Sequence, residues 1–333
     1  MPGIEIRAPD DFHAHLRQGA PLAAFARRHA AGFARVAPMP NTLPPLATPA
    51  ALVDYVASIE RAAPGLAVIP VFKLMPGMDE NDVRALAEAG ARIGKYYPAG
   101  STTNSGDGIR DPAEVDEALG AMRELGLALA VHAEEPSAPI LERETAFLPV
   151  LDRIVRAHPG LRLSVEHLSG AAAVRWVEEA PETVGATITA HHLCFTLEDL
   201  LGESLDTALY CKPLPKSGAD RAELRRAACS GSRKFFFGSD SAPHEPARKA
   251  AGAAGVYAAP VALALLAGCF EEEGALDGLE GFIAVHGAAF HGLEPNRGSV
   301  RLWREDWTVP EAVDGVRPLA AGRTLRWKAA RSA

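Results

Sequence analysis

An eightfold alternation of short β-rich runs and amphipathic helical stretches constrains the fold of this chain more than any other feature. Several helical stretches open at Thr, Asp or Pro and close at Gly or Pro, as helix caps prefer. Eight alternations in 333 residues predict an α/β fold of the (β/α)8 barrel (TIM barrel) type rather than an open doubly wound sheet. No Gly-x-Gly-x-x-Gly motif follows the first run to favour dinucleotide binding. The strand-like runs cover 4–16, 33–41, 66–74, 91–98, 127–134, 161–169, 185–193 and 234–244, and the clearest helical stretches cover 48–64, 79–90, 111–126 and 170–182.

The chain shows the composition of one ordinary globular domain. Its residues are 48% hydrophobic and 23% charged, which excludes disordered and fibrous classes. No long Pro, Gly or Ser linker divides it. We therefore expect a single barrel domain over 1–333, with a short C-terminal extension after about residue 294.

Charge and hydropathy narrow the function classes. A formal net charge of -8 argues against a nucleic-acid or anionic-membrane partner, so an anionic substrate needs a local cationic site. The longest apolar run, 256–270, contains Pro260 and is too short to span a bilayer, and the acidic N-terminus lacks an apolar signal region. We expect a cytoplasmic protein whose four cysteines are reduced thiols rather than metal ligands.

The motif "DFHAHLR", residues 11–17, places two histidines two positions apart. In a strand that ran this far, Asp11, His13, His15 and Arg17 would share one face. A His-x-His pair alone predicts little, since it also occurs on solvated edge strands. Whether the pair binds a metal therefore depends on which side chains the other predicted strands place beside it.

Polar side chains recur at the carboxyl ends of the predicted strands, where barrel enzymes build their sites. Each buried imidazole or carboxylate there must find a partner, and a pair of divalent metals satisfies the histidines and the aspartate together. Imidazole and carboxylate ligands fit zinc, and manganese or cobalt suit the same ligand types. The strand-end residues are His13, His15, Asn41, Lys95, His132, His167 and Asp240.

Lys95 is unusual in such a set because an ammonium group repels dications. A desolvated lysine can instead lose its proton and react with carbon dioxide, which gives an N-carboxylate whose two oxygens can bridge two metals. The alternative is a lysine that reaches solvent or pairs with Asp107.

Seven motifs, in their order and spacing over about 9–328, resemble the short bacterial-type dihydroorotases of the amidohydrolase superfamily. They are "DFHAHLR", "MPN", "KYYPAGSTTNS", "VHAE", "EHLS", "TIT" and "GSDSAPH". The resemblance implies a binuclear zinc enzyme that interconverts dihydroorotate and N-carbamoyl-aspartate in pyrimidine synthesis. It assigns one metal to His13, His15 and Asp240, the other to His132 and His167, and a bridging role to a hydroxide and to Lys95 carboxylated by CO2.

The resemblance also implies how the substrate is held. Arg17, Asn41 and His244 match positions that bind the substrate carboxylate. Thr102 and Thr103 match a mobile loop, here 99–108, that closes over it. A homodimer is expected as well.

Two departures limit this transfer. The stretch "RKAAGAAG", residues 248–255, lacks the cysteines that the family often has there, so only a backbone contact near Ala254 carries over. Lys212 stands where a leucine can occur, and the direction of its amine is open. We expect His191 and His192 to form part of the pocket wall or to support the metal ligands from behind, rather than to act in catalysis. We interpret the remaining histidines, His29, His158, His286 and His291, as structural.

Asp240 is expected to accept a proton from the nucleophile and to pass it to the departing ring nitrogen. A hydantoinase or allantoinase is the nearest alternative enzyme, but Arg17 provides a clamp for a carboxylate that hydantoins need not carry. A catalytically inactive barrel that serves as an interaction partner is the alternative outside enzymes. The presence of every expected ligand argues against it.

Overall fold

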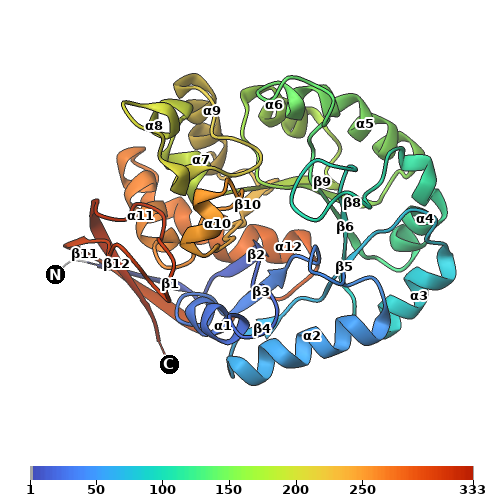
Figure 1. Cartoon of the computed structure of the whole chain (residues 1–333), viewed down its shortest axis with the longest axis horizontal. Coiled ribbons are helices and arrows are strands. Elements are labelled where there is room, and N and C mark those ends of the chain that lie inside the picture. The colour runs from blue at the N-terminus through green and yellow to red at the C-terminus, as the bar shows by residue number, and fades with distance from the viewer. Residues whose placement is uncertain (1–2, 333) are drawn as a thin grey trace.

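Short buried strands pair in parallel to build the central barrel of the computed structural model, which describes residues 3–332 (Figure 1). Successive strands pair with one another from β2 to β4 and from β5 to β10, all in parallel. Pro70, which has no amide hydrogen to donate, lies between β4 and β5, so these two short strands together form the third position. The barrel strands are β2 (Asp10–Ala14), β3 (Arg35–Pro38), β4 (Ala67–Val68), β5 (Val71–Lys73), β6 (Ile93–Tyr96), β7 (Ala128–Val131), β8 (Arg162–Val165), β9 (Val184–Ile188) and β10 (Phe235–Phe237).

The barrel closes between its first and last strands. Ala14 and Ser241 form an isolated parallel bridge. The Asp240 amide donates to the His13 carbonyl at 2.8 Å, and the His15 amide donates to the Ser241 carbonyl at 2.8 Å. The predicted (β/α)8 architecture is confirmed, and its seam lies at residues expected to bind metal.

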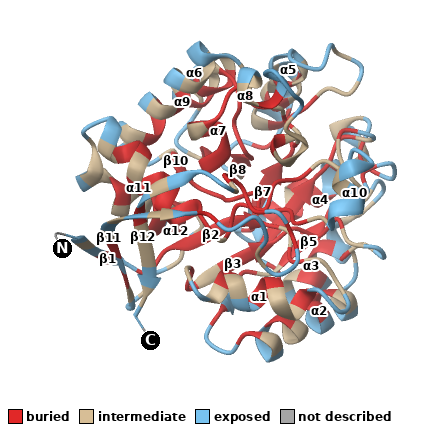
Figure 2. Ribbon diagram, turned by 60° about the vertical axis from the view of Figure 1, so that its left-hand side comes forward, coloured by how far each residue is buried: buried red, intermediate tan, exposed pale blue. Residues whose placement is uncertain are grey.

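Helices surround the barrel, and the buried residues concentrate on the strands and on the inner faces of the helices (Figure 2). Two helices begin where the sequence predicted: the Thr48 hydroxyl accepts from the Ala51 amide, and Asp79 forms a capping box with Asp82. The helices are α1 (Leu22–Ala30), α2 (Pro49–Ala62), α3 (Glu80–Glu88), α4 (Asp116–Glu124), α5 (Arg143–Ala157), α6 (Ala171–Glu179), α7 (Ala190–Cys194), α8 (Leu197–Leu201), α9 (Gly218–Cys229), α10 (Pro246–Ala250), α11 (Ala262–Glu272) and α12 (His286–Phe290). None of those described is long and apolar enough to cross a membrane.

The first predicted strand, 4–16, is two strands, so this prediction is wrong in detail. Pro9 lies between them, and the earlier strand, β1 (Gly3–Arg7), leaves the barrel. It pairs antiparallel with β11 (Ser299–Thr308), which pairs with β12 (Thr324–Arg331). The segment expected to extend past residue 294 thus forms a small sheet with the N-terminal strand, beside the barrel (Figure 1).

Gly287 in α12 packs against the floor of the barrel and generates a stability prediction. A Cβ atom there would lie 2.6 Å from Phe12 Cδ2 and 3.0 Å from Phe236 Cδ2, and both rings are buried. Gly287→Ala should therefore lower the free energy of unfolding by about 1–3 kcal/mol, measured by denaturant titration. The control is Gly120→Ala in α4, where a Cβ meets no atom within 4 Å and stability should stay equal or rise. Equal stability of the two variants would contradict this packing.

Candidate metal centre and substrate pocket

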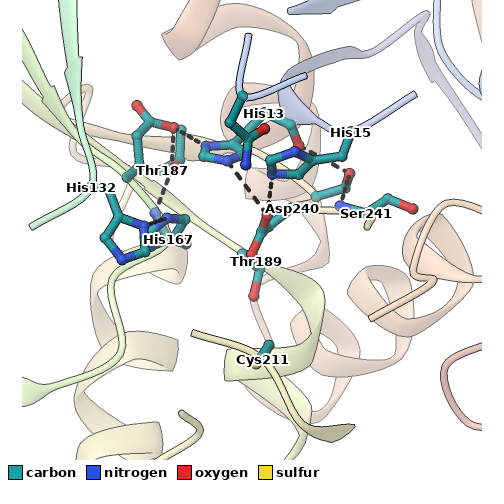
Figure 3. A network of polar contacts seen from close by, with 12 residues as sticks. His13, His15, His132, His167, Thr187, Thr189, Cys211, Asp240 and Ser241 are labelled. Atoms are coloured by element: carbon teal, nitrogen blue, oxygen red, sulfur yellow. Dashed lines mark hydrogen bonds and ion pairs between the residues drawn. The ribbon is translucent and has the colours of Figure 1, made fainter. Parts of the chain in front are cut away.

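The seam of the barrel brings together the first predicted ligand group. His13 lies in β2, His15 just beyond it, and Asp240 just beyond β10. Asp240 Oδ1 lies 3.4 Å from His13 Nε2 and 3.2 Å from His15 Nε2 (Figure 3). One ligand atom from each residue lies within 4.8 Å of the other two, as in a site for one cation.

The second predicted group follows β7 and β8. His132 Nδ1 lies 3.1 Å from His167 Nε2, and the His13 and His167 ring centroids are 5.0 Å apart, so the two groups adjoin. Burial lowers the pKa of His13 and His167 well below the ordinary value, which keeps both imidazoles neutral. Neutral imidazoles with nitrogen atoms turned toward each other are the form that ligates a divalent metal.

Two buried glutamates orient these histidines, and the sequence analysis assigned neither a role. His13 Nδ1 donates to Glu166 Oε2 at 2.6 Å, and His132 Nε2 donates to Glu134 Oε2 at 2.8 Å. Each bond occupies one ring nitrogen and leaves the other to face the ligand cluster, as carboxylates do for metal-bound histidines. Their positions, directly before His167 and two residues after His132, were the available signal.

Lys95 in β6 is fully buried, and its Nζ has no hydrogen-bond partner among residues 3–332. Burial lowers its pKa to about 8, so the reactive neutral amine is accessible near physiological pH. The alternative that it pairs with Asp107 is wrong, because Asp107 pairs with Lys73, the residue opposite Lys95 in the β5–β6 register. The alternative that it reaches solvent is wrong as well. An orphaned amine among neutral imidazoles fits a carboxylated lysine beside metals.

Backbone strain concentrates at the same place. Arg17, His167 and Asp240 have φ values of 64°, 46° and 44°, in the left-handed region that glycine favours. Such conformations cost about 1–3 kcal/mol each and persist where the surroundings impose them, commonly at functional sites.

One pocket joins the ligand groups to most of the predicted substrate residues. Arg17 Nε donates to the Pro243 carbonyl at 2.9 Å, which fixes the guanidinium in the wall. Burial lowers its pKa to about 10, so it remains a cation at neutral pH. The lining residues are His13, His15, Arg17, Asn41, Tyr97, Thr102, Thr103, His132, His167, Lys212, Asp240, Ala242, Ala254 and Gly255.

Two of the residues predicted to bind the substrate carboxylate, His244 and Asn41, are hydrogen-bonded to other parts of the protein in this structure. His244 is not among the lining residues; its Nε2 lies 3.0 Å from Arg17 Nη2 and 2.9 Å from the Ala254 carbonyl, behind the guanidinium. Asn41 lines the pocket, but its Nδ2 donates to the Thr103 carbonyl at 3.0 Å. It therefore holds the 99–108 segment in this structure, and a contact with substrate stays a prediction.

A second cluster, His191, His192 and Cys211, also brings its ligand atoms within 4.8 Å of one another. Both ring nitrogens of His192 have hydrogen-bond partners: Nδ1 lies 3.0 Å from Thr189 Oγ1, and Nε2 lies 3.2 Å from the Pro213 carbonyl. Cys211 Sγ donates to the same carbonyl, and burial raises the pKa of its thiol well above the ordinary value. None of the three residues lines the pocket, so the structure does not place His191 and His192 in its wall. All four cysteines are free.

Comparison with known proteins agrees with this geometry. The family model described as Amidohydrolase matches residues 1–266. A dihydroorotase of Hahella chejuensis is 40% identical over 342 residues, covering 99% of each chain. The crystal structure of dihydroorotase in complex with 5-fluoroorotic acid from Saccharomyces cerevisiae superposes with a TM-score of 0.93 at 30% identity, covering 99% of each chain. An L-hydantoinase of Arthrobacter aurescens shares the fold alone, with a TM-score of 0.85 at 18% identity over 99% of this chain and 83% of its own.

The barrel, with its histidines and aspartate at the carboxyl ends of the strands, defines an amidohydrolase. Within that class, the full-length similarity at 40% identity is decisive. The chain belongs to the dihydroorotase family.

The buried amine of Lys95 generates a prediction about metal content. Lys95→Ala should lose most of the bound metal and the activity, because no carbamate can then form beside the histidines. Short carboxylic acids such as acetate should restore part of both by entering the vacated space. Metal analysis and hydrolysis assays on the same preparation test this, and a variant with full metal content and wild-type turnover would rule out the carbamate.

Proposed function

We propose that this pocket interconverts dihydroorotate and N-carbamoyl-aspartate in pyrimidine synthesis. One observation carries the proposal: the partly buried Arg17 guanidinium lines the same pocket as both groups of candidate metal ligands. A fixed, planar cation suits the carboxylate of the substrate, and it provides local positive charge in a chain whose net charge is -8.

We further propose two zinc ions per chain. His13, His15 and Asp240 would hold one, His132 and His167 the other, with carboxylated Lys95 shared between them. Other divalent metals suit the same ligands. When bound, the metals supply a Lewis acid for the ring carbonyl and a water that ionises near neutral pH.

Asp240 is the proposed proton carrier. Burial opposes its ionisation, yet the hydrogen bond to His15 and the neighbouring imidazoles keep its pKa below the ordinary value. It is thus ionised at neutral pH, able to accept a proton from the attacking water and to pass it to the ring nitrogen as the C–N bond breaks. The new carboxylic acid ionises, so ring opening releases one proton overall.

The remaining pocket residues complete substrate binding in this proposal. Asn41 and His244 assist Arg17 at the carboxylate, His244 by contacting the guanidinium. Thr102 and Thr103 close over the substrate from the 99–108 segment, and Lys212 and the backbone at Ala254 contribute to the wall. A hydantoinase activity has no comparable use for Arg17, and an inactive barrel has none for the ligand set.

The cellular setting is also a proposal: a cytoplasmic homodimer that acts on a small molecule, without a nucleic-acid or membrane partner. The negative net charge and the family support this setting. Sedimentation analysis distinguishes the dimer from a monomer.

Arg17→Met tests the proposed substrate. The variant keeps a side chain of similar length but removes the cation, so kcat/KM for dihydroorotate should fall about a hundredfold or more, the scale of a lost charge-assisted bidentate contact. Metal content should stay unchanged, since Arg17 is not among the proposed ligands. Normal kinetics in this variant would contradict recognition of a carboxylate by Arg17.

Asp240 generates a prediction about pH. Ring opening begins with its carboxylate ionised and ring closure with it protonated, so hydrolysis should rise with pH while cyclisation falls. The group titrates together with its neighbours, and the apparent pKa belongs to the cluster. Asp240→Asn should abolish both directions even where metal remains. Parallel pH profiles for the two directions would remove Asp240 from the proton path.

A further inference from the structure

Lys73, which the sequence analysis did not single out, makes an unusual contact with the segment 99–108, here called the lid segment. The residue is in β5, and its side chain is only 1% exposed. Its Nζ donates to the Asn104 carbonyl at 3.0 Å and forms an ion pair with Asp107. Both partners lie in the lid segment, and Lys73 itself is outside the pocket lining. The amine therefore reaches the lid from within the barrel.

The two sides of this ion pair differ in what they lose when the lid segment moves away. The Asp107 side chain is 47% exposed and can exchange Lys73 for water. Lys73 is buried, and the Tyr97 ring centroid lies 6.0 Å from its Nζ. Opening would separate the Lys73 ammonium from its counter-ion and from the Asn104 carbonyl, which is unfavourable. The pair therefore favours the closed position.

Asn104 makes a second contact that holds the lid segment in place. Asn104 Nδ2 donates to the Asn41 carbonyl at 2.9 Å, while the Asn104 carbonyl accepts from Lys73. Asn104 has a φ of 56°, which turns the backbone so that both bonds form. Thr102 and Thr103, directly before it, line the pocket. Holding Asn104 thus fixes where the two threonines stand.

We propose that Lys73 is a positioning residue that holds the lid segment closed over the pocket before substrate arrives, through Asp107 and the Asn104 carbonyl. Its effect on catalysis rests on the proposed function, whereas its effect on the lid does not. Without this contact the closed lid becomes a minor state, and apparent substrate affinity falls in proportion to its population. The substitution leaves Thr102 and Thr103 unchanged, so kcat should be little affected once substrate is bound.

Hydrogen exchange in the substrate-free holoenzyme tests the effect on the lid directly. Lys73→Met and, separately, Asp107→Asn should speed amide exchange within 99–108. The second variant is included because Asp107 is half-exposed, so its substitution should not disturb folding. The matched control is Lys234→Met, which removes another largely buried lysine whose Nζ bonds the carbonyls of Val177, Glu178 and Ala180 at the opposite end of the barrel. Exchange in the lid segment should be unchanged there. Wild-type exchange within 99–108 in both test variants would overturn the proposal.

Steady-state kinetics separate positioning from general damage. If the closed population falls to about a tenth, KM for dihydroorotate should rise about tenfold with kcat changed less than about twofold. Metal content should be unchanged in the test variants. Asp107→Glu, which keeps the negative charge, should have a KM close to the wild-type value. A fall in kcat with unchanged KM would overturn the positioning role. An inactive wild-type enzyme with the expected exchange pattern would instead reject the proposed function and leave the lid contact in place.

Discussion

The burial of Lys95 with no hydrogen-bond partner among residues 3–332 is the constraint on which the site depends. Its amine lies among neutral imidazoles, and the one carboxylate that the sequence offered as a partner, Asp107, is bound to Lys73. Leaving a buried amine unpaired is costly, and a lysine in that state loses its proton readily. The proposed conversion to a carbamate would remove the unpaired amine and complete the proposed set of metal ligands.

The barrel seam explains why the ligands from distant strands meet. Backbone hydrogen bonds join His13 to Asp240 and His15 to Ser241, so the same contacts that close the sheet set the distances among the first three candidate ligands. His167 and Asp240 both adopt the left-handed backbone conformation beyond the ends of their strands. The backbone hydrogen bonds of the seam therefore offset the conformational strain at these residues.

The sequence was sufficient where information is local. Strand–helix alternation predicted the barrel, and polar residues at strand ends predicted which candidate ligands the structure brings together. It failed where a partner lies far along the chain. Pairing of β1 with β11 joins residues almost 300 positions apart, and the spacing within 4–16 carries no sign of it. The Lys73–Asp107 pair depends likewise on how the lid segment folds back, and the roles of Glu134 and Glu166 depend on ring orientation.

The most direct test of the account is ¹³C NMR of the holoenzyme after metal reconstitution in ¹³C-bicarbonate, with metal counted on the same sample. The account predicts one carbamate carbon per chain in step with two bound metals, and no such signal in the Lys95→Ala variant. Two tightly bound metals and full dihydroorotate hydrolysis without a carbamate signal would contradict it.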